Sequence, residues 1–364
     1  MTWESDPRRA GSAAFRGVRA AGVDAHADLA VDGARVAAGG FWVVVGSFEG
    51  RLDAWRMDRV TRDDAAETPS GRSWEGPDGR AWSSSLDRAG YLAGVEAIRR
   101  DIRDGEAYQV NLCRMLEARL PAAAPGPDAV ALAERLAAGN PARHAARIVV
   151  PEAPGRPGAW VVSASPELYL RVSGTTVESS PIKGTCAPGE AMLPKDDAEN
   201  VMITDLIRND LSHVARPGSV RVPELLGLHE HPGLVHLQST VAAELAPEYD
   251  WTPALWPALL DGTFPPGSVS GAPKSSALRI IAREEPVARG PYCGAIGWID
   301  ADRREAELAV GIRTFAWSPE RGGVLRFGTG AGITWGSDPA GEWEETELKA
   351  RRLIALASAT RMSA

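Results

Sequence analysis

A mixed α/β (α+β) fold is what this sequence predicts, on three observations. The chain has 364 residues, 44% hydrophobic and 24% charged, a composition that supports one large domain or two ordinary ones with a sizeable core. Amphipathic stretches with the three- and four-residue spacing of helices recur along it. Between them lie short apolar or alternating stretches bounded by Gly, Pro and Asp, as is typical of strands.

Charge and cysteine usage narrow the classes of function. The formal net charge is −8 and no basic run stands out, so neither nucleic acid nor an anionic membrane is an expected partner. The first ten residues are polar, and no apolar run approaches the length of a membrane span, so a cytoplasmic location is expected. Three cysteines, Cys113, Cys186 and Cys293, lack metal-ligand spacing and are expected to be reduced core thiols.

The N-terminal part contains one clear pattern, that of a β-hairpin. Phe41 to Phe48 is almost entirely apolar and predicts a buried strand. Residues 51–56 are expected to pair with it through the turn at Glu49-Gly50. Residues 61–85 are rich in Asp, Gly, Ser and Pro, and we predict a loop there.

An amphipathic helix and a strand with a polar face are predicted next. Ser85 is the candidate cap of a helix that ends at Gly105. Residues 107–115 then alternate, with Gln109 and Asn111 among the polar positions. This suits a strand with one face towards a polar cavity or one face in solvent, and the pattern leaves both open.

Glu167 is the first residue whose setting indicates chemistry. A Pro/Ala-rich linker at 121–127 leads to a short helix ending near Gly139, and strands are expected near 147–150 and 160–164. Glu167 then follows Pro166 between apolar segments. A carboxylate in such a setting commonly has a shifted pKa, as a general acid requires.

Lys183 lies between Pro181-Ile182 and Gly184-Thr185. Most lysines are solvated surface charges, and this is the ordinary interpretation. Proline and glycine, however, make the backbone on both sides conformationally special, so the amine is expected to be presented at a fixed place. A lysine nucleophile is possible there.

The middle of the chain combines a helix, a strand and a loop. A helix with an acidic first turn is predicted from Asp196 to Pro217, where the helix dipole favours negative charge. His236 lies in a predicted strand over 235–241, and an ordinary structural histidine also explains it. Residues 264–274 are expected to be a Gly/Ser-rich loop before a helix that runs to about Glu285.

The C-terminal third is predicted to begin with an antiparallel meander. Strands are expected at 294–299, 307–315 and 324–327. The segment Gly328 to Gly332 follows, where missing side chains let a ligand approach the backbone.

Acidic residues mark one face of the last helix. Glu342, Glu345 and Lys349 share that face because they are three, four and seven positions apart. The face suits a site for Mg²⁺ and an anionic ligand. A solvated row of salt bridges explains the same spacing.

Six segments, taken in order, carry a resemblance to a known family. They are Tyr108-Gln109-Val110-Asn111-Leu112, Ser165-Pro166-Glu167-Leu168, Pro181-Ile182-Lys183-Gly184-Thr185, Ala198 through Leu211, Gly271-Ala272-Pro273-Lys274 and Glu344 through Ala350. Over about residues 86–358 the chain resembles the chorismate-utilising enzymes. Each motif is weak alone, and their ordered set is highly specific.

The resemblance implies a fold of two large, mainly antiparallel β-sheets packed as a sandwich, with helices outside. Residues 86–358 would form the chorismate-binding catalytic region. Residues 1–85 would be a divergent N-terminal part of the same single structural domain.

The resemblance also implies roles for individual residues. Glu167 would be the acid that helps the C4 hydroxyl of chorismate leave, and Lys183 would add to the ring, with Thr185 and His236 nearby. The implied ligands of Mg²⁺ are Glu199, Glu342 and Glu345. The residues implied to bind the substrate are Gln109, Asn111, Tyr292, Arg313, Gly330, Ala331, Gly332 and Lys349.

Within the family, Lys183 resembles the lysine of aminodeoxychorismate synthase component I, which leads to 4-aminobenzoate and folate. Anthranilate- and salicylate-forming members typically have alanine there. No glutaminase signature is visible, so ammonia would come from a separate glutamine amidotransferase subunit. Anthranilate synthase component I and a catalytically silent chorismate-binding subunit stay as alternatives. Trp335 departs from the family pattern, and its ring is expected near the substrate loop.

Overall fold

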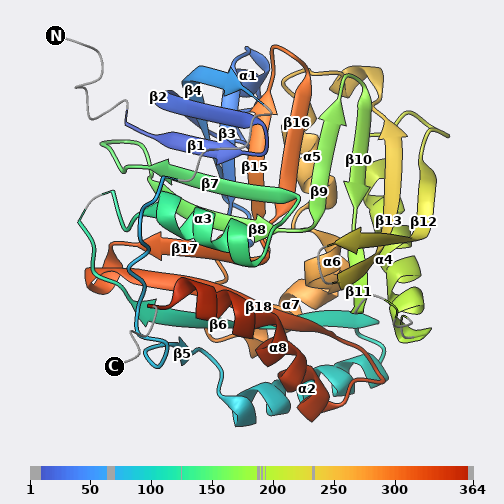
Figure 1. Ribbon diagram of the computed structural model, residues 1–364. Helices are drawn as coiled ribbons and strands as arrows, with labels where there is room; N and C mark the ends of the chain where they lie inside the picture. Colours follow the sequence, from blue (N-terminus) through green and yellow to red (C-terminus); the bar gives the residue numbers. More distant parts are fainter. Residues whose placement is uncertain are drawn as a thin grey trace.

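The computed structural model describes residues 10–63, 70–123, 125–186, 189, 192, 194–231 and 234–359, and the side chains of Thr185, Cys186, Pro194, Lys195, His231 and Leu234 lie outside this description. Figure 1 shows a large curled sheet with helices packed outside it. Within these ranges, no helix combines the length and the apolar character that crossing a membrane demands.

The described residues form an 18-stranded sheet in which the strand pairings are antiparallel. The strands are β1 (Ser12–Phe15), β2 (Val18–Asp28), β3 (Phe41–Gly46), β4 (Leu52–Arg62), β5 (Ser83–Ser84), β6 (Gln109–Arg119), β7 (His144–Val150), β8 (Ala159–Ser165), β9 (Leu168–Ser173), β10 (Thr176–Ser180), β11 (Ile182–Cys186), β12 (Arg221–His231), β13 (Leu234–Glu244), β14 (Gly271–Ala272), β15 (Ala295–Asp300), β16 (Glu305–Val310), β17 (Thr314–Ser318) and β18 (Val324–Ile333).

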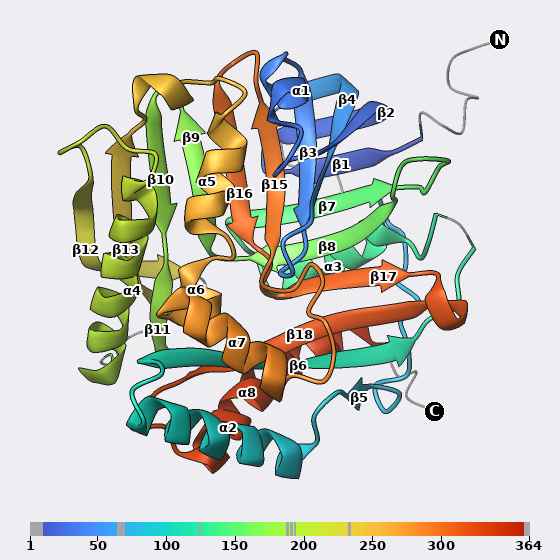
Figure 2. The same ribbon diagram turned by 180° about the vertical axis from the view of Figure 1, so that it is seen from behind.

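The helices lie on the outer faces of this sheet. They are α1 (Gly33–Ala37), α2 (Arg88–Arg103), α3 (Ala129–Gly139), α4 (Pro194–Ser212), α5 (Leu255–Thr263), α6 (Gly267–Ser270), α7 (Lys274–Glu284) and α8 (Pro339–Ala357), with 3-10 turns at η3 (Pro247–Tyr249) and η4 (Glu320–Gly322). Seen from behind, α4, α5, α6 and α7 cover one side of the molecule (Figure 2).

The hydrogen bonding is continuous from one end of the sheet to the other. The neighbours run β12, β13, β10, β9, β16, β15, β3, β4, β2, β1, β7, β8, β17, β18 and β6. Strands β9, β10, β13, β15 and β16 run at a steep angle to β6, β7, β17 and β18 (Figure 1). The two antiparallel sheets expected from the family resemblance are therefore two arms of one curled sheet.

Strand β3 shows why the apolar run at Phe41 became a central strand. Its alternate side chains enter two different cores, with Trp42 and Val44 in one and Phe41, Val43 and Val45 in the other. Both faces are buried, so the run needs no polar alternation. A third core lies between β8, β17, β18 and helices α3 and α8. Each fully buried large apolar side chain contributes roughly 1.5–3 kcal/mol.

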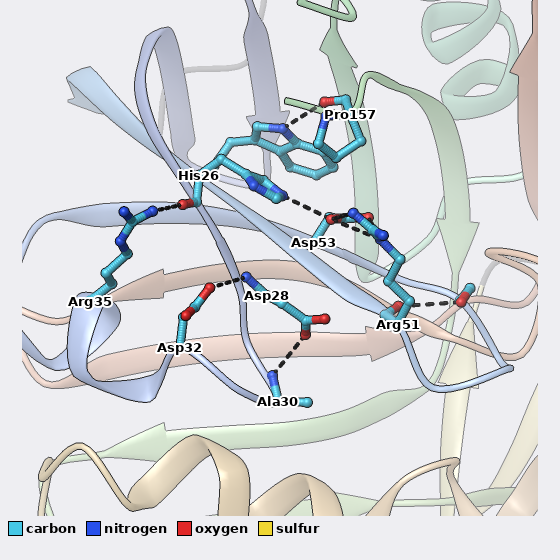
Figure 3. A network of polar contacts seen from close by, with 10 residues as sticks. His26, Asp28, Ala30, Asp32, Arg35, Arg51, Asp53 and Pro157 are labelled. Carbon is cyan, nitrogen blue, oxygen red and sulfur yellow. Dashed lines mark hydrogen bonds and ion pairs between the residues drawn. The ribbon is translucent and has the colours of Figure 1, made fainter. Parts of the chain in front are cut away.

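The N-terminal strands β2 and β4 are joined by a polar network (Figure 3). They are also joined by the two cores that β3 enters. On β2, His26 Nε2 lies 2.8 Å from Asp53 Oδ1 on β4, and Arg51 Nε donates to the same carboxylate at 2.9 Å. Arg35 Nη1 donates to the His26 carbonyl at 2.6 Å, which attaches α1 to β2. These partners hold the pKa of Asp53 below its usual value, although partial burial opposes them.

Helix α2 begins later than Ser85. Its cap is Asp87, whose carboxylate accepts from the Gly90 amide at 2.8 Å. Ser85 instead exchanges hydrogen bonds with the backbone of Met115, which places it alongside β6. Helix α4 ends at Ser212, before Pro217.

The predicted meander is right for two pairs and wrong at its middle. β15 pairs with β16 and β17 pairs with β18, but β16 pairs onward with β9 and β17 with β8. The extended conformation is interrupted between β16 and β17, at residues 311–313, where Arg313 has a left-handed φ of 51°. The segment from Gly328 to Gly332 does not follow the last strand but forms part of β18.

Residues 264–274 are not an open loop. They contain α6 and β14, and residues 265–272 are all buried. β14 pairs with the start of β6, because Gly271 lies opposite Val110 and Ala272 opposite Gln109. The segment therefore brings Ser268 next to Lys183.

Candidate active site

The candidate site lies where β11, α4, α6, the turn between β8 and β9, and the adjacent ends of β6, β18 and α8 meet (Figure 1). Most residues proposed from the sequence come to this place from segments far apart in the chain. Lys183 lies at the centre of the site, because other residues there either form a hydrogen bond with it or carry charges that act on its amine.

Lys183 has a fixed amine. Its Nζ donates to the carbonyl of Ser268 at 3.0 Å. Next to it, Gly184 has φ 83°, and a Cβ there would lie 2.8 Å from Cβ of Asp196, so glycine is needed for both reasons. Burial lowers the pKa of Lys183, against the opposing charges of Glu199 and Glu167, so the amine is closer to neutrality than an exposed lysine.

Glu167 is the second titratable group of the site. It is 4% exposed, and burial raises its pKa to about 6. A hydrogen bond from the Ser268 side chain and the Lys183 charge oppose this rise. Ser268 therefore contacts both groups, through its hydroxyl and its carbonyl.

Strand β6 supplies a buried polar side chain. Gln109 is 2% exposed, and its Nε2 donates to Glu199 Oε2 on α4 at 3.3 Å. The sequence pattern left two predictions for this strand, a polar face towards a cavity or a polar face in solvent. The second is wrong, because Arg114 is buried as well as Gln109. Asn111 turns to Cys113, with Nδ2 donating to Sγ at 3.0 Å.

The glycines of β18 lie against β6. Gly332 lies opposite Asn111, and a Cβ on it would collide with Nε2 of Gln109. A Cβ on Gly330 would lie 2.6 Å from Cys113 Sγ. The pairing leaves Ala331 buried between them, with the backbone of β18 close to the amide of Gln109.

Helix α8 contributes charged groups. Lys349 Nζ lies 2.7 Å from Glu345 Oε1 and donates to the Gly330 carbonyl at 3.1 Å. The charges of Glu345 and Lys349 both act on Lys183. Glu342, one turn earlier on the helix, is 7% exposed.

The acidic groups suit magnesium by donor type. Carboxylate oxygens are the ligands Mg²⁺ prefers, and it commonly takes one or two of them while keeping water and substrate in its shell. Within the described ranges, no group of three Asp, Glu, His or Cys side chains is close enough to hold an ion together. The carboxylates of Glu199, Glu342 and Glu345 are therefore suitable ligands for Mg²⁺ by their chemistry. Fewer than three of them would bind the ion at the same time.

The remaining proposed residues are placed as follows. The Arg313 guanidinium is near enough to Glu167 for their charges to interact, while burial lowers the pKa of Arg313. Tyr292 is buried against Gly328, and burial raises its pKa. His236 is 2% exposed and lies opposite Thr185 in the pairing of β13 with β11. The side chain of Thr185 lies outside the described residues.

Two features of the site were not anticipated from the sequence. Ser268 acts partly through its carbonyl, which every residue type has, so only the buried Gly/Ser-rich context could have indicated it. Trp335 was expected to place its ring near the substrate loop. Its ring is 57% exposed, with the Arg99 guanidinium 5.7 Å from the ring centre.

Comparison with known proteins agrees with the six motifs. A family model described as chorismate binding enzyme matches residues 48–355. Anthranilate synthase component 1 of Streptomyces coelicolor (strain ATCC BAA-471 / A3(2) / M145) is 35% identical over 302 residues, 80% of this chain and 54% of that protein. Aminodeoxychorismate synthase component 1 of Klebsiella aerogenes is 37% identical over 284 residues, 74% of this chain and 58% of that protein. The chain thus spans about half the length of the curated relatives it matches.

Solved structures show the same fold. The menaquinone-specific isochorismate synthase from Escherichia coli superposes with a TM-score of 0.75 at 19% identity, covering 96% of this chain and 90% of that one. Anthranilate synthase component I from Streptococcus pneumoniae TIGR4 gives a TM-score of 0.68 at 23% identity, with 87% and 80% covered. The predicted fold class is confirmed, and the chain belongs to the family of chorismate binding enzymes.

Proposed function

We propose that this chain catalyses the amination of chorismate at C4 with loss of the hydroxyl, giving 4-amino-4-deoxychorismate. The observation that carries the proposal is the Lys183 amine, which lies within hydrogen-bond distance of the Ser268 carbonyl and has a lowered pKa. A lysine at this position resembles the aminodeoxychorismate branch of the family. One relative, 37% identical, has the name aminodeoxychorismate synthase component 1.

The two titratable groups suit the proposed step. Hydroxide is a poor leaving group, so the C4 oxygen needs a proton as its bond to carbon breaks, and Glu167 would supply it. Lys183 must be neutral to form a bond to the ring. Burial lowers the pKa of the amine and raises that of the acid to about 6, so both shifts favour the neutral pair. Ammonia would then form the new C–N bond at C4 while the bond between Lys183 and the ring breaks.

In this proposal magnesium would be held by one or two of the carboxylates of Glu199, Glu342 and Glu345 at a time, with water and substrate as its other ligands. The ion would supply positive charge that binds and orients a carboxylate of chorismate. Arg313 and Lys349 are the cationic side chains expected to bind the substrate's carboxylates. Gln109 is expected to orient Glu199, since its amide donates to that carboxylate.

A second subunit is part of the proposal. Several relatives bear names ending in component 1, which implies a partner component. We infer a glutamine amidotransferase that releases ammonia. Copurification with such a subunit and a gain of glutamine-dependent turnover are the expected results.

Chorismate turnover tests the proposal. The purified chain with Mg²⁺, chorismate and an ammonium salt is expected to give 4-amino-4-deoxychorismate, identified by mass. Lys183→Ala should abolish this product, and removing Mg²⁺ with a chelator should do the same. A wild-type preparation that binds chorismate and never consumes it would instead identify a catalytically silent subunit.

Anthranilate synthesis is the second candidate. It is favoured by relatives named anthranilate synthase component 1, one at 35% and another, from Saccharolobus solfataricus (strain ATCC 35092 / DSM 1617 / JCM 11322 / P2), at 42% identity. Anthranilate is fluorescent and has lost pyruvate, so release of pyruvate by the chain alone separates the two reactions.

A further inference from the structure

We propose that Arg289, paired with Glu285, is a positioning residue that fixes the acceptor of the Lys183 amine relative to strand β6. The inference deepens the proposed function and rests on it for the role of Lys183. A single buried guanidinium donates to the segment that holds the acceptor and to strand β6.

Arg289 and Glu285 form a fully buried ion pair. Their side chains are 1% and 6% exposed. Arg289 Nε donates to Glu285 Oε2 at 2.8 Å and Nη2 donates to Oε1 at 2.6 Å. The guanidinium also lies 4.0 Å from the ring centre of Phe48. This two-point geometry holds the guanidinium plane in one orientation.

The same guanidinium donates to two backbone carbonyls. Nη1 bonds to Val269 O at 2.9 Å and Nη2 to Asn111 O at 2.8 Å. Val269 directly follows Ser268, whose carbonyl accepts from Lys183. Asn111 lies two positions from Gln109, whose amide contacts Glu199. One side chain therefore links the segment that holds the amine to the strand on the other side of the site.

The pair also takes the place of a neighbouring strand. Along one edge of β6, β14 pairs only with Gln109 and Val110, and β5 pairs only with Leu116 and Glu117. Between them, Asn111 O accepts from Arg289, and Cys113 N donates to Glu285 Oε1 at 2.8 Å. Without the pair, two buried backbone groups would lose their partners, so this part of β6 would shift.

Lysine cannot reproduce this arrangement. Its ammonium is a compact point charge, whereas Arg289 presents donors in a fixed plane to a carboxylate and two carbonyls at once. With lysine in its place, α6 would be free to move relative to β6. The amine of Lys183 would gain access to water, which stabilises its ammonium form, so its pKa should rise towards that of an exposed lysine.

The test compares four variants. Arg289→Lys keeps the charge and removes the planar fork. The double variant Arg289→Met/Glu285→Met replaces the ion pair with apolar side chains, an exchange that buried pairs often tolerate in stability. Arg283→Lys is the matched control, because this arginine near the end of α7 is also ion-paired but 52% exposed. Leu132→Ala, on α3 in the core that this helix forms with β8, β17, β18 and α8, provides a loss of stability away from the site.

Two readouts separate positioning from mere stability. The first is the pH dependence of Lys183 modification by an amine reagent, measured by mass spectrometry, which requires no turnover. The second is kcat and KM for chorismate with ammonia. Arg289→Lys and the double variant should raise the apparent pKa of the Lys183 amine and lower kcat by about 10- to 100-fold with little change in KM. The two control variants should do neither.

The proposal is overturned if folded Arg289→Lys keeps the wild-type Lys183 profile and kcat. It is also overturned if Leu132→Ala, at a similar fall in Tm, produces the same changes as Arg289→Lys. If wild-type protein consumes no chorismate, the proposed function fails, and the modification profile still decides the role of Arg289.

Discussion

At the scale of single residues, the buried carboxyl of Glu167 lowers the stability of the folded protein when it is ionised, and a proton on it suits the role of an acid. A carboxyl that is buried beyond the reach of water has its charged form disfavoured, which raises its pKa to about 6. Folding therefore favours the proton on Glu167. Any stability gained this way is present below the unfolded pKa and is lost as the pH rises through about 6.

Glu167→Gln should accordingly be more stable than wild type at pH 8, by up to about 2 kcal/mol from the pKa difference. The advantage should shrink as the pH falls through about 6 and should vanish below the unfolded pKa, where Glu167 is neutral in both states. Urea unfolding at several pH values measures it. The same variant should lose chorismate turnover, and a pH-rate limb near 6 in wild type should disappear. Equal stability of the two proteins at pH 8 would contradict the argument.

The pKa of Asp53 is shifted in the opposite direction from that of Glu167. Its hydrogen bonds to His26 and Arg51 lower its pKa, so the stability it contributes is present above the unfolded pKa and is lost as the pH falls through the lower folded value. Asp53→Asn is expected to cost about 1 kcal/mol at pH 7.

The difference between Asp53→Asn and wild type should vanish in acid, which thermal unfolding from pH 7 down to pH 3 can follow. Asp24→Asn is the control, because Asp24 pairs with Arg56 at 2.8 Å and its side chain is 27% exposed, against 15% for Asp53. It should cost less than Asp53→Asn. A larger cost for the control would contradict the role given to the network in Figure 3.

At this scale the sequence predicted residue types better than contacts. Lys183 and Glu167 were identified from their proline and glycine neighbours and from the family motifs. Ser268 was not, because its carbonyl contact with Lys183 leaves no mark on residue identity. Arg289 was missed for a related reason. A buried arginine that bonds to backbone looks like any surface arginine until its surroundings are known.

At the scale of elements, the close pairing of β18 with β6 makes glycine necessary at position 332. A Cβ there would collide with the Gln109 amide. Gly332→Ala should displace Gln109 from Glu199 and reduce chorismate turnover by at least about 10-fold. Gly336→Ala, where an added Cβ meets nothing within 4 Å, should leave activity unchanged. Steady-state kinetics on both variants checks this, and equal activities would refute the steric argument.

Helix α8 is attached to the sheet by Arg114. Its Nε donates to Thr346 Oγ1 at 3.0 Å, its Nη2 pairs with Glu347, and the guanidinium lies 4.1 Å from the ring centre of Trp343. Arg114→Leu is expected to cost about 2 kcal/mol, since Thr346 and Glu347 lose a buried charged donor.

Arg99→Leu is the comparison for this measurement, because Arg99 lies over the exposed ring of Trp335. It should cost less than about 1 kcal/mol. Urea denaturation of the two variants gives both values. If the buried and exposed arginines cost the same, Arg114 does not anchor the helix.

Elements with a clear period were predicted well, and irregular ones were not. Helices α2 and α3 followed from apolar spacing and from the glycines that end them. The split between β16 and β17 was missed, because Gly311-Ile312-Arg313 continues the apolar alternation although Arg313 adopts a left-handed backbone. The short α6 and β14 were missed because burial, not local preference, holds them in place.

At the scale of the whole molecule, the family resemblance predicted more than the residues alone. Periodicity indicated strands at both ends of the chain but could not give their order. Strand order depends on contacts between distant segments, such as Val43 with Trp298 and Leu170 with Leu308. Two sheets were expected, and one continuous curled sheet was found.

The order of strands in that sheet has a consequence for synthesis of the chain. Strands β15 and β16, from the last quarter of the chain, lie between β3 and β9. A nascent chain therefore holds the N-terminal hairpin with an unpaired, apolar edge until residue 300 has left the ribosome. Such edges are prone to aggregation, and pairing between distant segments is slow. We expect chains that end at residue 290 to be insoluble, whereas a soluble, cooperatively folding fragment would show that the early strands are stable alone. We therefore expect the first strands of this protein to need protection during translation until β15 and β16 have been synthesised.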